Sequence, residues 1–217
     1  MNLNRVSGLV LIVAAVTFVG GWLLMPDAGT ADAAHILDVV SGQRAGVWWS
    51  VVAHLVSSIA FVTAVVGIQT DPIVNASPLA RAGAWLVLVG AVGVCMDAFF
   101  HLVAYYFTAP GVAAAAILEP MRLLQTKGIA FLVPLLISLI VGGMVYTLAL
   151  WRVAVTTAWP FRVVVTAIGI AMVGGTAAAG LGQGRRDVVL GFLILLAIGY
   201  GWAGYEIATG RRRQVAA

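Results

Sequence analysis

Six long apolar runs dominate the pattern of hydrophobic and polar positions along the chain. They cover residues 6–25, 47–69, 83–108, 129–151, 163–181 and 188–208. A helix needs about 20 apolar residues to cross the hydrocarbon core of a bilayer, and each run is about that long. Strands of a membrane barrel would show alternating hydrophobicity over about 10 residues, which these runs lack. The pattern predicts an all-α bundle of six transmembrane helices, forming a single domain over residues 1–217.

Two of the segments between these runs carry similar sequences. Residues 33–38 read Ala-Ala-His-Ile-Leu-Asp and residues 114–119 read Ala-Ala-Ala-Ile-Leu-Glu. A basic residue, Arg44 or Lys127, follows each segment shortly before the next run. An apolar face beside a charged face is typical of a helix lying on the membrane surface. The repeat therefore predicts three hairpins, with short outer interfacial helices after the first and third spans; chance similarity of two alanine-rich loops is the alternative.

The composition agrees with a membrane protein and excludes a water-soluble surface. Hydrophobic residues make up 62% of the chain and charged residues 9%, whereas soluble domains carry roughly 25% charged residues. The single cysteine, Cys95, excludes an intrachain disulfide and a CxxC motif. The net charge of +4 comes from arginines in the loops, so nucleic acid is not an expected partner. The lipid bilayer is the expected environment, and membrane-protein partners or a homo-oligomer are compatible with it.

The basic residues favour one orientation in the membrane. Cytoplasmic loops carry an excess of Lys and Arg, and the side that holds both termini has more of them. That side carries Arg5, Arg81, Arg152, Arg162, Arg211, Arg212 and Arg213, and the other carries Arg44, Arg122, Lys127, Arg185 and Arg186. Both termini are therefore predicted to be cytoplasmic. Glu206, near the cytoplasmic end of the sixth run, is predicted to face lipid headgroups or Arg211.

Three stretches of the first third of the chain resemble a known bacterial family. They are Arg5-Val-Ser-Gly-Leu-Val-Leu-Ile-Val-Ala-Ala-Val, His35-Ile-Leu-Asp-Val-Val and Trp48-Trp-Ser-Val-Val-Ala-His-Leu-Val. They are similar to six-helix integral membrane proteins of unknown function that are common in actinobacteria. The resemblance implies a helical membrane fold in a bacterial plasma membrane. It carries over no catalytic residues.

Ionisable residues inside the apolar runs mark the place to look for function, because a charge at bilayer depth costs several kcal/mol unless it is paired or hydrated. His54 lies in the second run, and Asp97 and His101 lie one helical turn apart in the third. His54 follows Gly46 by about 12 Å along a helix, and His101 precedes Thr108 by about 10 Å. Because consecutive spans are antiparallel, the two imidazoles are expected at matching depth in the outer half.

Four interpretations of this cluster stay open. In the first, His54, Asp97 and His101 bind a transition metal with help from His35 or Glu119, because imidazole and carboxylate suit zinc, copper or iron. In the second, His54 and His101 hold a b-type haem between neighbouring helices. In the third, Asp97 bonds to one of the histidines and fastens the two helices, as buried polar residues often do. The last is a polar pocket for a small ligand, a lipid or a quinone.

The sequence favours a non-catalytic membrane protein: a scaffold, an accessory subunit, or a binder of a small ligand or lipid. A catalytic site needs several convergent titratable groups, and the runs hold one such cluster. The alternatives are a metal- or haem-binding redox protein that uses His54, Asp97 and His101, and a small-solute transporter. A separation of the two imidazoles above about 15 Å would exclude both a haem and a single metal ion between them.

Overall fold

The computed structural model of the protein describes residues 3–26, 32–178 and 184–210, and within these ranges every regular element is a helix. The elements are α1 (Leu3–Leu24), α2 (Ala33–Gly42), α3 (Arg44–Gln69), α4 (Pro72–Ala76), α5 (Pro78–Phe107), α6 (Ala114–Leu123), the π-helix η1 (Leu124–Gly128), α7 (Ile129–Arg152), α8 (Trp159–Ala178) and α9 (Gly184–Thr209). Residues 179–181 of the fifth run, the side chain of Arg185 and the tail arginines 211–213 lie outside the description. The all-helical fold agrees with the sequence prediction.

Five helical stretches of the described chain are long and apolar enough to cross a membrane. They are Asn4–Leu24, Arg44–Gln69, Pro78–Phe107, Ala115–Arg152 and Arg186–Thr209. The remaining predicted span, the fifth run at 163–181, corresponds to α8, whose described apolar part, Trp159–Gly174, is shorter than the other five stretches. Within the described residues there are therefore five membrane-length helices, where the sequence predicted six spans.

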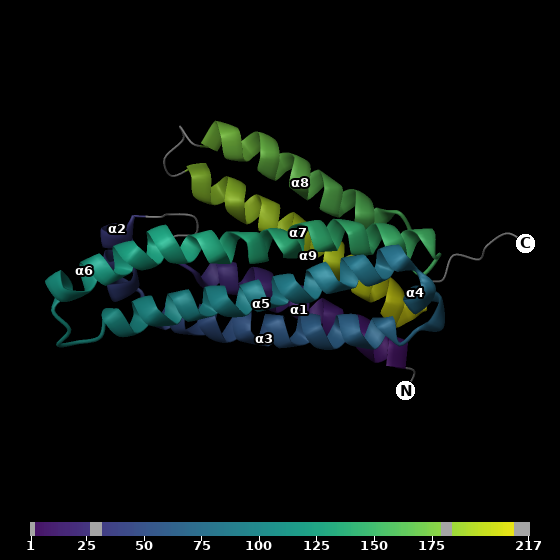
Figure 1. The fold of residues 1–217 in the computed structure, drawn as a ribbon, viewed down its shortest axis with the longest axis horizontal. Coiled ribbons are helices and arrows are strands. Elements are labelled where there is room, and N and C mark those ends of the chain that lie inside the picture. The colour runs from purple at the N-terminus through teal and green to yellow at the C-terminus, as the bar shows by residue number, and fades with distance from the viewer. Residues whose placement is uncertain (1–2, 27–31, 179–183, 211–217) are drawn as a thin grey trace, which may run out of the picture.

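The long helices lie side by side along the longest axis of the molecule (Figure 1). In this bundle α1 packs against α3 and α9, α3 packs against α5, and α5 packs against α7. Helix α8 packs mainly on α9, with a smaller contact to α7. Helices α2 and α6 lie at one end of the bundle, and both chain termini lie at the other. We call these the α2/α6 end and the terminal end.

Small residues allow the long helices to approach closely, as they commonly do in lipid. Helices α1 and α9 meet at Gly8 and Gly204, where an added Cβ on either glycine would lie within 2.6 Å of backbone atoms of the other helix. Between α5 and α7, a Cβ on Gly90 would lie 2.4 Å from the backbone of Leu139. The Tyr200 hydroxyl of α9 donates to the same Leu139 carbonyl at 2.8 Å. These contacts fix the bundle around one main apolar core.

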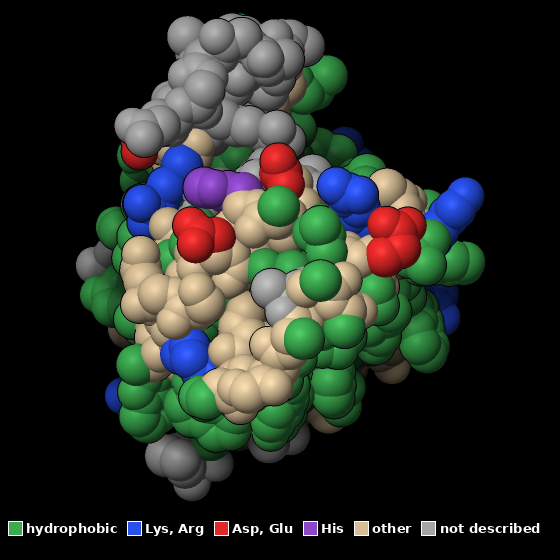
Figure 2. Space-filling view, turned by 90° about the vertical axis from the view of Figure 1, so that its left-hand side faces the viewer, with side chains coloured by type: hydrophobic (Ala, Val, Ile, Leu, Met, Phe, Trp, Pro, Cys, Tyr) green, Lys and Arg blue, Asp and Glu red, His purple; other side chains and the backbone are tan. Residues whose placement is uncertain are grey.

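A second, smaller apolar cluster covers the α2/α6 end. Asp32 caps α2 by accepting hydrogen bonds from the backbone N–H groups of Ala34 and His35, and the apolar face of α2 packs into this cluster. The cluster consists of Met25, Ala33, Leu37, Val40, Val47, Ala104, Ile117 and Met121. Figure 2 shows this end from outside, with charged side chains gathered on it and apolar side chains on the flanks.

Helix α6 differs from the separate surface helix that the repeat predicted. Its last residues and the first of η1 keep right-handed helical dihedral angles, with φ −60° and ψ −46° at Leu124. The backbone therefore stays helical from α6 through η1 into α7, although Pro120 lies inside α6. Of the two predicted interfacial helices, α2 ends before the next span begins, and α6 extends a spanning helix.

Candidate metal-binding site

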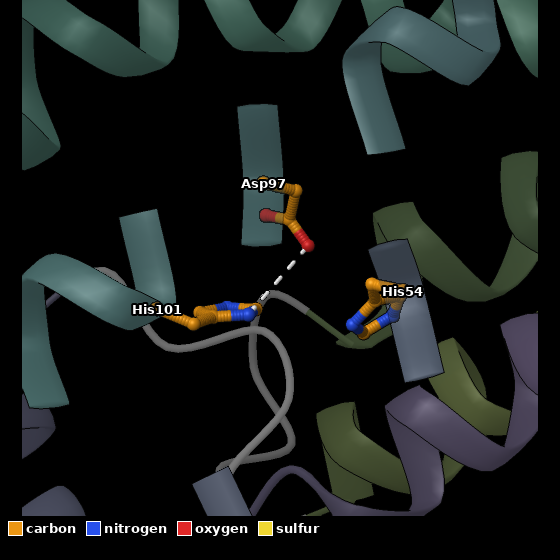
Figure 3. Close-up of side chains that lie close together, drawn as sticks. All are labelled: His54, Asp97 and His101. Carbon is orange, nitrogen blue, oxygen red and sulfur yellow. Dashed lines mark ion pairs between the residues drawn. The ribbon is translucent and has the colours of Figure 1, made fainter. Parts of the chain in front are cut away.

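The structure brings His54, Asp97 and His101 together. His54 comes from α3, and Asp97 and His101 come from α5. Figure 3 shows the three side chains pointing toward one another. One potential ligand atom from each lies within 4.8 Å of the other two, and the imidazole centroids are 6.0 Å apart. The imidazoles are thus well inside the 15 Å limit and lie at matching depth, as the antiparallel spans predicted.

Local sequence explains why these side chains meet. Asp97 and His101 are four residues apart, so they share one face of α5. Helix α3 is held against this region of α5 by the hydroxyl of Ser58, which donates to the carbonyl of Ala91 at 2.7 Å. His54 lies one turn before Ser58 and therefore shares its face of α3.

The cluster is largely shielded from solvent. His54 is fully buried, and the side chains of Asp97 and His101 are 8% and 22% exposed. Burial of a carboxylate beside two imidazoles removes hydration from all three groups, and this is unfavourable unless other partners replace the water. Because His101 is partly exposed, solvent and small ligands can reach the cluster from the side of this residue.

Polar atoms of the cluster lack hydrogen-bond partners within the described chain. His54 Nε2, Asp97 Oδ2 and His101 Nδ1 are all buried and unpaired in this sense. Asp97 Oδ2 and His101 Nδ1 are 3.8 Å apart, an ion-pair distance that is too long for a hydrogen bond. Each unsatisfied buried group costs about 1–3 kcal/mol. The helix-fastening interpretation stays open, because Asp97 makes an ion-pair contact with His101 although no direct hydrogen bond joins Oδ2 to a histidine within the described chain.

Three further residues shape the site, and the sequence analysis did not assign them to it. Ser50, one turn before His54 on α3, places its hydroxyl 3.4 Å from His54 Nδ1, which leaves Nε2 to face the cluster. Gly21 of α1 lies against the His54 ring, and a Cβ there would be 2.8 Å from the ring. Trp22 contacts both imidazoles edge-on, with centroid distances of 5.2 Å to His54 and 6.2 Å to His101. The i, i+4 spacing could have indicated Ser50, whereas no spacing relates the residues of α1 to the cluster.

The structure does not bring the two additional predicted ligands into the cluster. His35 lies on the exposed face of α2, and the group of ligand atoms within the described chain consists of the other two histidines and Asp97. Glu119 is exposed on α6 and pairs with Arg122 at 3.7 Å. Both residues belong to the charged surface of the α2/α6 end.

The geometry suits a single ion better than a haem. A porphyrin bound by His54 and His101 would have to fill the space between the two imidazoles. A carboxylate oxygen of Asp97 lies within 4.8 Å of a ring nitrogen of each histidine, and Trp22 contacts both rings. With these side chains around them, the two imidazoles do not form opposite walls of a flat slot that could hold a porphyrin. Two imidazoles and one carboxylate converging on one point are instead the ligand set of a mononuclear metal site.

Comparisons with protein-family models, with curated proteins and with solved structures found no match to this chain. The resemblance to a bacterial membrane-protein family therefore stays a prediction. The class that the structure supports is an all-helical protein whose long apolar helices are compatible with a membrane.

Proposed function

We propose that this protein is a polytopic membrane protein that binds one divalent transition-metal ion through His54, Asp97 and His101. The observation that carries the proposal is the convergence of three residues, each of which has a potential ligand atom within 4.8 Å of the other two and a buried polar atom without a hydrogen-bond partner in the described chain. A bound cation would satisfy the carboxylate and both imidazole nitrogens at once, and it would offset the cost of burying them.

Ligand chemistry favours zinc or iron(II) as the ion. Three protein ligands that combine two histidines with a carboxylate are found in catalytic zinc sites and in non-haem iron(II) sites. Bonds of about 2 Å in a tetrahedral site place the ligand atoms roughly 3.3 Å apart, so small side-chain rotations would close the present spacing. Copper(I) prefers thiolate or thioether ligands, and the cluster contains neither.

The membrane setting is part of the same proposal. We infer six spans, with α8 as the fifth in chain order, and both termini in the cytoplasm of a bacterial cell. Support comes from the 20-residue length of α8, from its packing on α9, and from the sequence, in which the predicted cytoplasmic side carries seven of the twelve basic residues. In this orientation the metal site lies in the half of the bundle that faces away from the cytoplasm.

Metal analysis of the purified protein tests this function, and the chain supplies its own control because it has three histidines. After loading with zinc or iron(II) and removal of free ion, the wild-type protein should retain about one ion per chain. His54→Ala and His101→Ala should each lose it, while His35→Ala should bind as the wild type does. A wild-type protein that retains no ion above background, or a site that survives both cluster substitutions, would show the proposal to be wrong.

A further inference from the structure

The proposed metal site has fewer protein ligands than a zinc or iron ion requires. Structural zinc sites are closed by four protein ligands, whereas sites with three keep a position for water or another small ligand. Within the described chain the group of converging ligand atoms comes from three residues. At least one coordination position of the ion is therefore left to a group that the protein does not supply.

Charge indicates what kind of ligand that is. A divalent cation bound by two neutral imidazoles and one carboxylate keeps one uncompensated positive charge. His54 is fully buried and Asp97 nearly so, and a net charge in such surroundings is unfavourable because little water reaches it. A monovalent anion in the remaining position makes the site neutral, whereas a neutral ligand does not.

Trp22 supplies a donor for such an anion. Its indole packs against both imidazoles, so it borders the space that the ion and its fourth ligand would share. The Nε1 atom of Trp22 is buried and has no hydrogen-bond partner within the described chain. An indole N–H can only donate, and the polar atoms of the cluster are taken by the ion. An acceptor bound to the ion is the partner that this N–H lacks.

We propose that the ion keeps an exchangeable position that takes a small monovalent anion, with the indole N–H of Trp22 as its hydrogen-bond donor. Hydroxide, azide and thiocyanate belong to this class of ligand. Entry is on the side of His101, the most exposed of the three ligands. This inference rests on the metal site proposed above, and it adds the chemical class of what that site binds.

Cobalt(II) makes the position visible, because its absorption bands respond to coordination number and ligand type. The full-length protein in detergent is loaded with cobalt(II) and titrated with azide, while perchlorate keeps the ionic strength constant. The wild-type bands should shift and saturate. Trp22→Phe should bind cobalt normally and weaken azide binding about tenfold or more, the effect of losing one hydrogen bond to a charged acceptor. Trp49→Phe, on an exposed tryptophan of α3, should match the wild type.

A second replacement separates the N–H from the shape of the side chain. The residue β-(3-benzothienyl)alanine at position 22 keeps the bicyclic ring and lacks the donor, and it should weaken azide binding as Trp22→Phe does. Wild-type azide affinity with this residue would overturn the role of Trp22. Cobalt bands that do not respond to azide would overturn the exchangeable position while leaving the metal site intact. Failure to bind cobalt at all, seen before azide is added, would overturn the metal site itself.

Discussion

Gly21 is the residue of α1 that gives the His54 imidazole its space. Its Cα faces the ring so closely that an added methyl group would lie 2.8–2.9 Å from three ring atoms. Such contacts force the ring or the helix to move. The neighbouring Gly20 faces open space, with no atom within 4 Å of an added Cβ. The two glycines therefore form a natural pair for testing how the site depends on α1.

Gly21→Ala should lower metal affinity about 10- to 100-fold, the usual effect of disturbing the support of a metal ligand. Gly20→Ala should leave the affinity unchanged. Competition against a chelator of known affinity measures both. Equal affinities in the two variants would mean that α1 does not set the position of His54.

Substitution of Asp97 tests whether the cluster binds a metal or serves only to hold α3 and α5 together. A buried carboxylate oxygen without a hydrogen-bond partner, as at Asp97 Oδ2, destabilises the metal-free fold, and removing the charge relieves this cost. Asp97→Asn should therefore raise the thermal unfolding temperature of the protein in the presence of a chelator, by an amount equivalent to about 1 kcal/mol. The same variant should lose the stabilisation that added zinc gives the wild type. A less stable metal-free variant would instead support the fastening role.

At the scale of elements, Glu206 joins the connection after α7 to the end of α9. Its carboxylate accepts hydrogen bonds from the backbone N–H and the hydroxyl of Thr157, both at 2.6 Å, and from the Trp202 indole at 2.8 Å. The sequence predicted that Glu206 faces headgroups or Arg211. It is buried instead. Two of its three donors belong to Thr157, in a loop 49 residues away in the chain, so no local sequence pattern indicates this contact. The tail arginine lies outside the described residues.

Glu206→Ala should loosen this connection without touching the metal site. Removing the carboxylate leaves two N–H donors without their acceptor, at a cost of about 1–3 kcal/mol each where they stay buried. We expect a lower unfolding temperature, faster proteolysis between residues 153 and 158, and unchanged metal affinity. Glu119→Ala, at an exposed position of α6, is the control and should be neutral. Unchanged proteolysis in Glu206→Ala would contradict the role of this carboxylate.

At the scale of the whole molecule, the open question is whether α8 crosses the membrane. If α8 crosses the membrane, Asp187 lies on the same side of it as Ser41 and Thr126, opposite to Asn75. If α8 stays on one face of the membrane, Asp187 lies on the side of Asn75. Single cysteines at these exposed positions, in a Cys95→Ala background, report the side through labelling of intact cells by an impermeant maleimide. We expect labelling of Ser41→Cys, Thr126→Cys and Asp187→Cys, and protection of Asn75→Cys. Protection of Asp187→Cys would reduce the count to five.

The parts of this structure that the sequence predicted are those that one helix determines alone. The runs at 47–69 and 129–151 became α3 (Arg44–Gln69) and α7 (Ile129–Arg152), because lipid requires a helix wherever about 20 apolar residues occur. The i, i+4 spacing and the expected matching depth predicted that His54, Asp97 and His101 lie together. Contacts between distant helices were not predictable in this way. Nothing in the local sequence around Trp22 indicates that its indole would lie against two imidazoles.

The origin of the site in three separate helices sets the order of events during biosynthesis. Helix α1 brings Gly21 and Trp22, α3 brings His54, and α5 brings the remaining two ligands. A nascent chain is made from its N-terminus, so His54 enters the membrane before either partner on α5 has been synthesised. The complete set of ligands forms only after the third long helix has been inserted and packed. In the proposed function, metal acquisition would therefore be a late maturation step, and a ribosome-bound chain that ends before His101 should be unable to hold the ion.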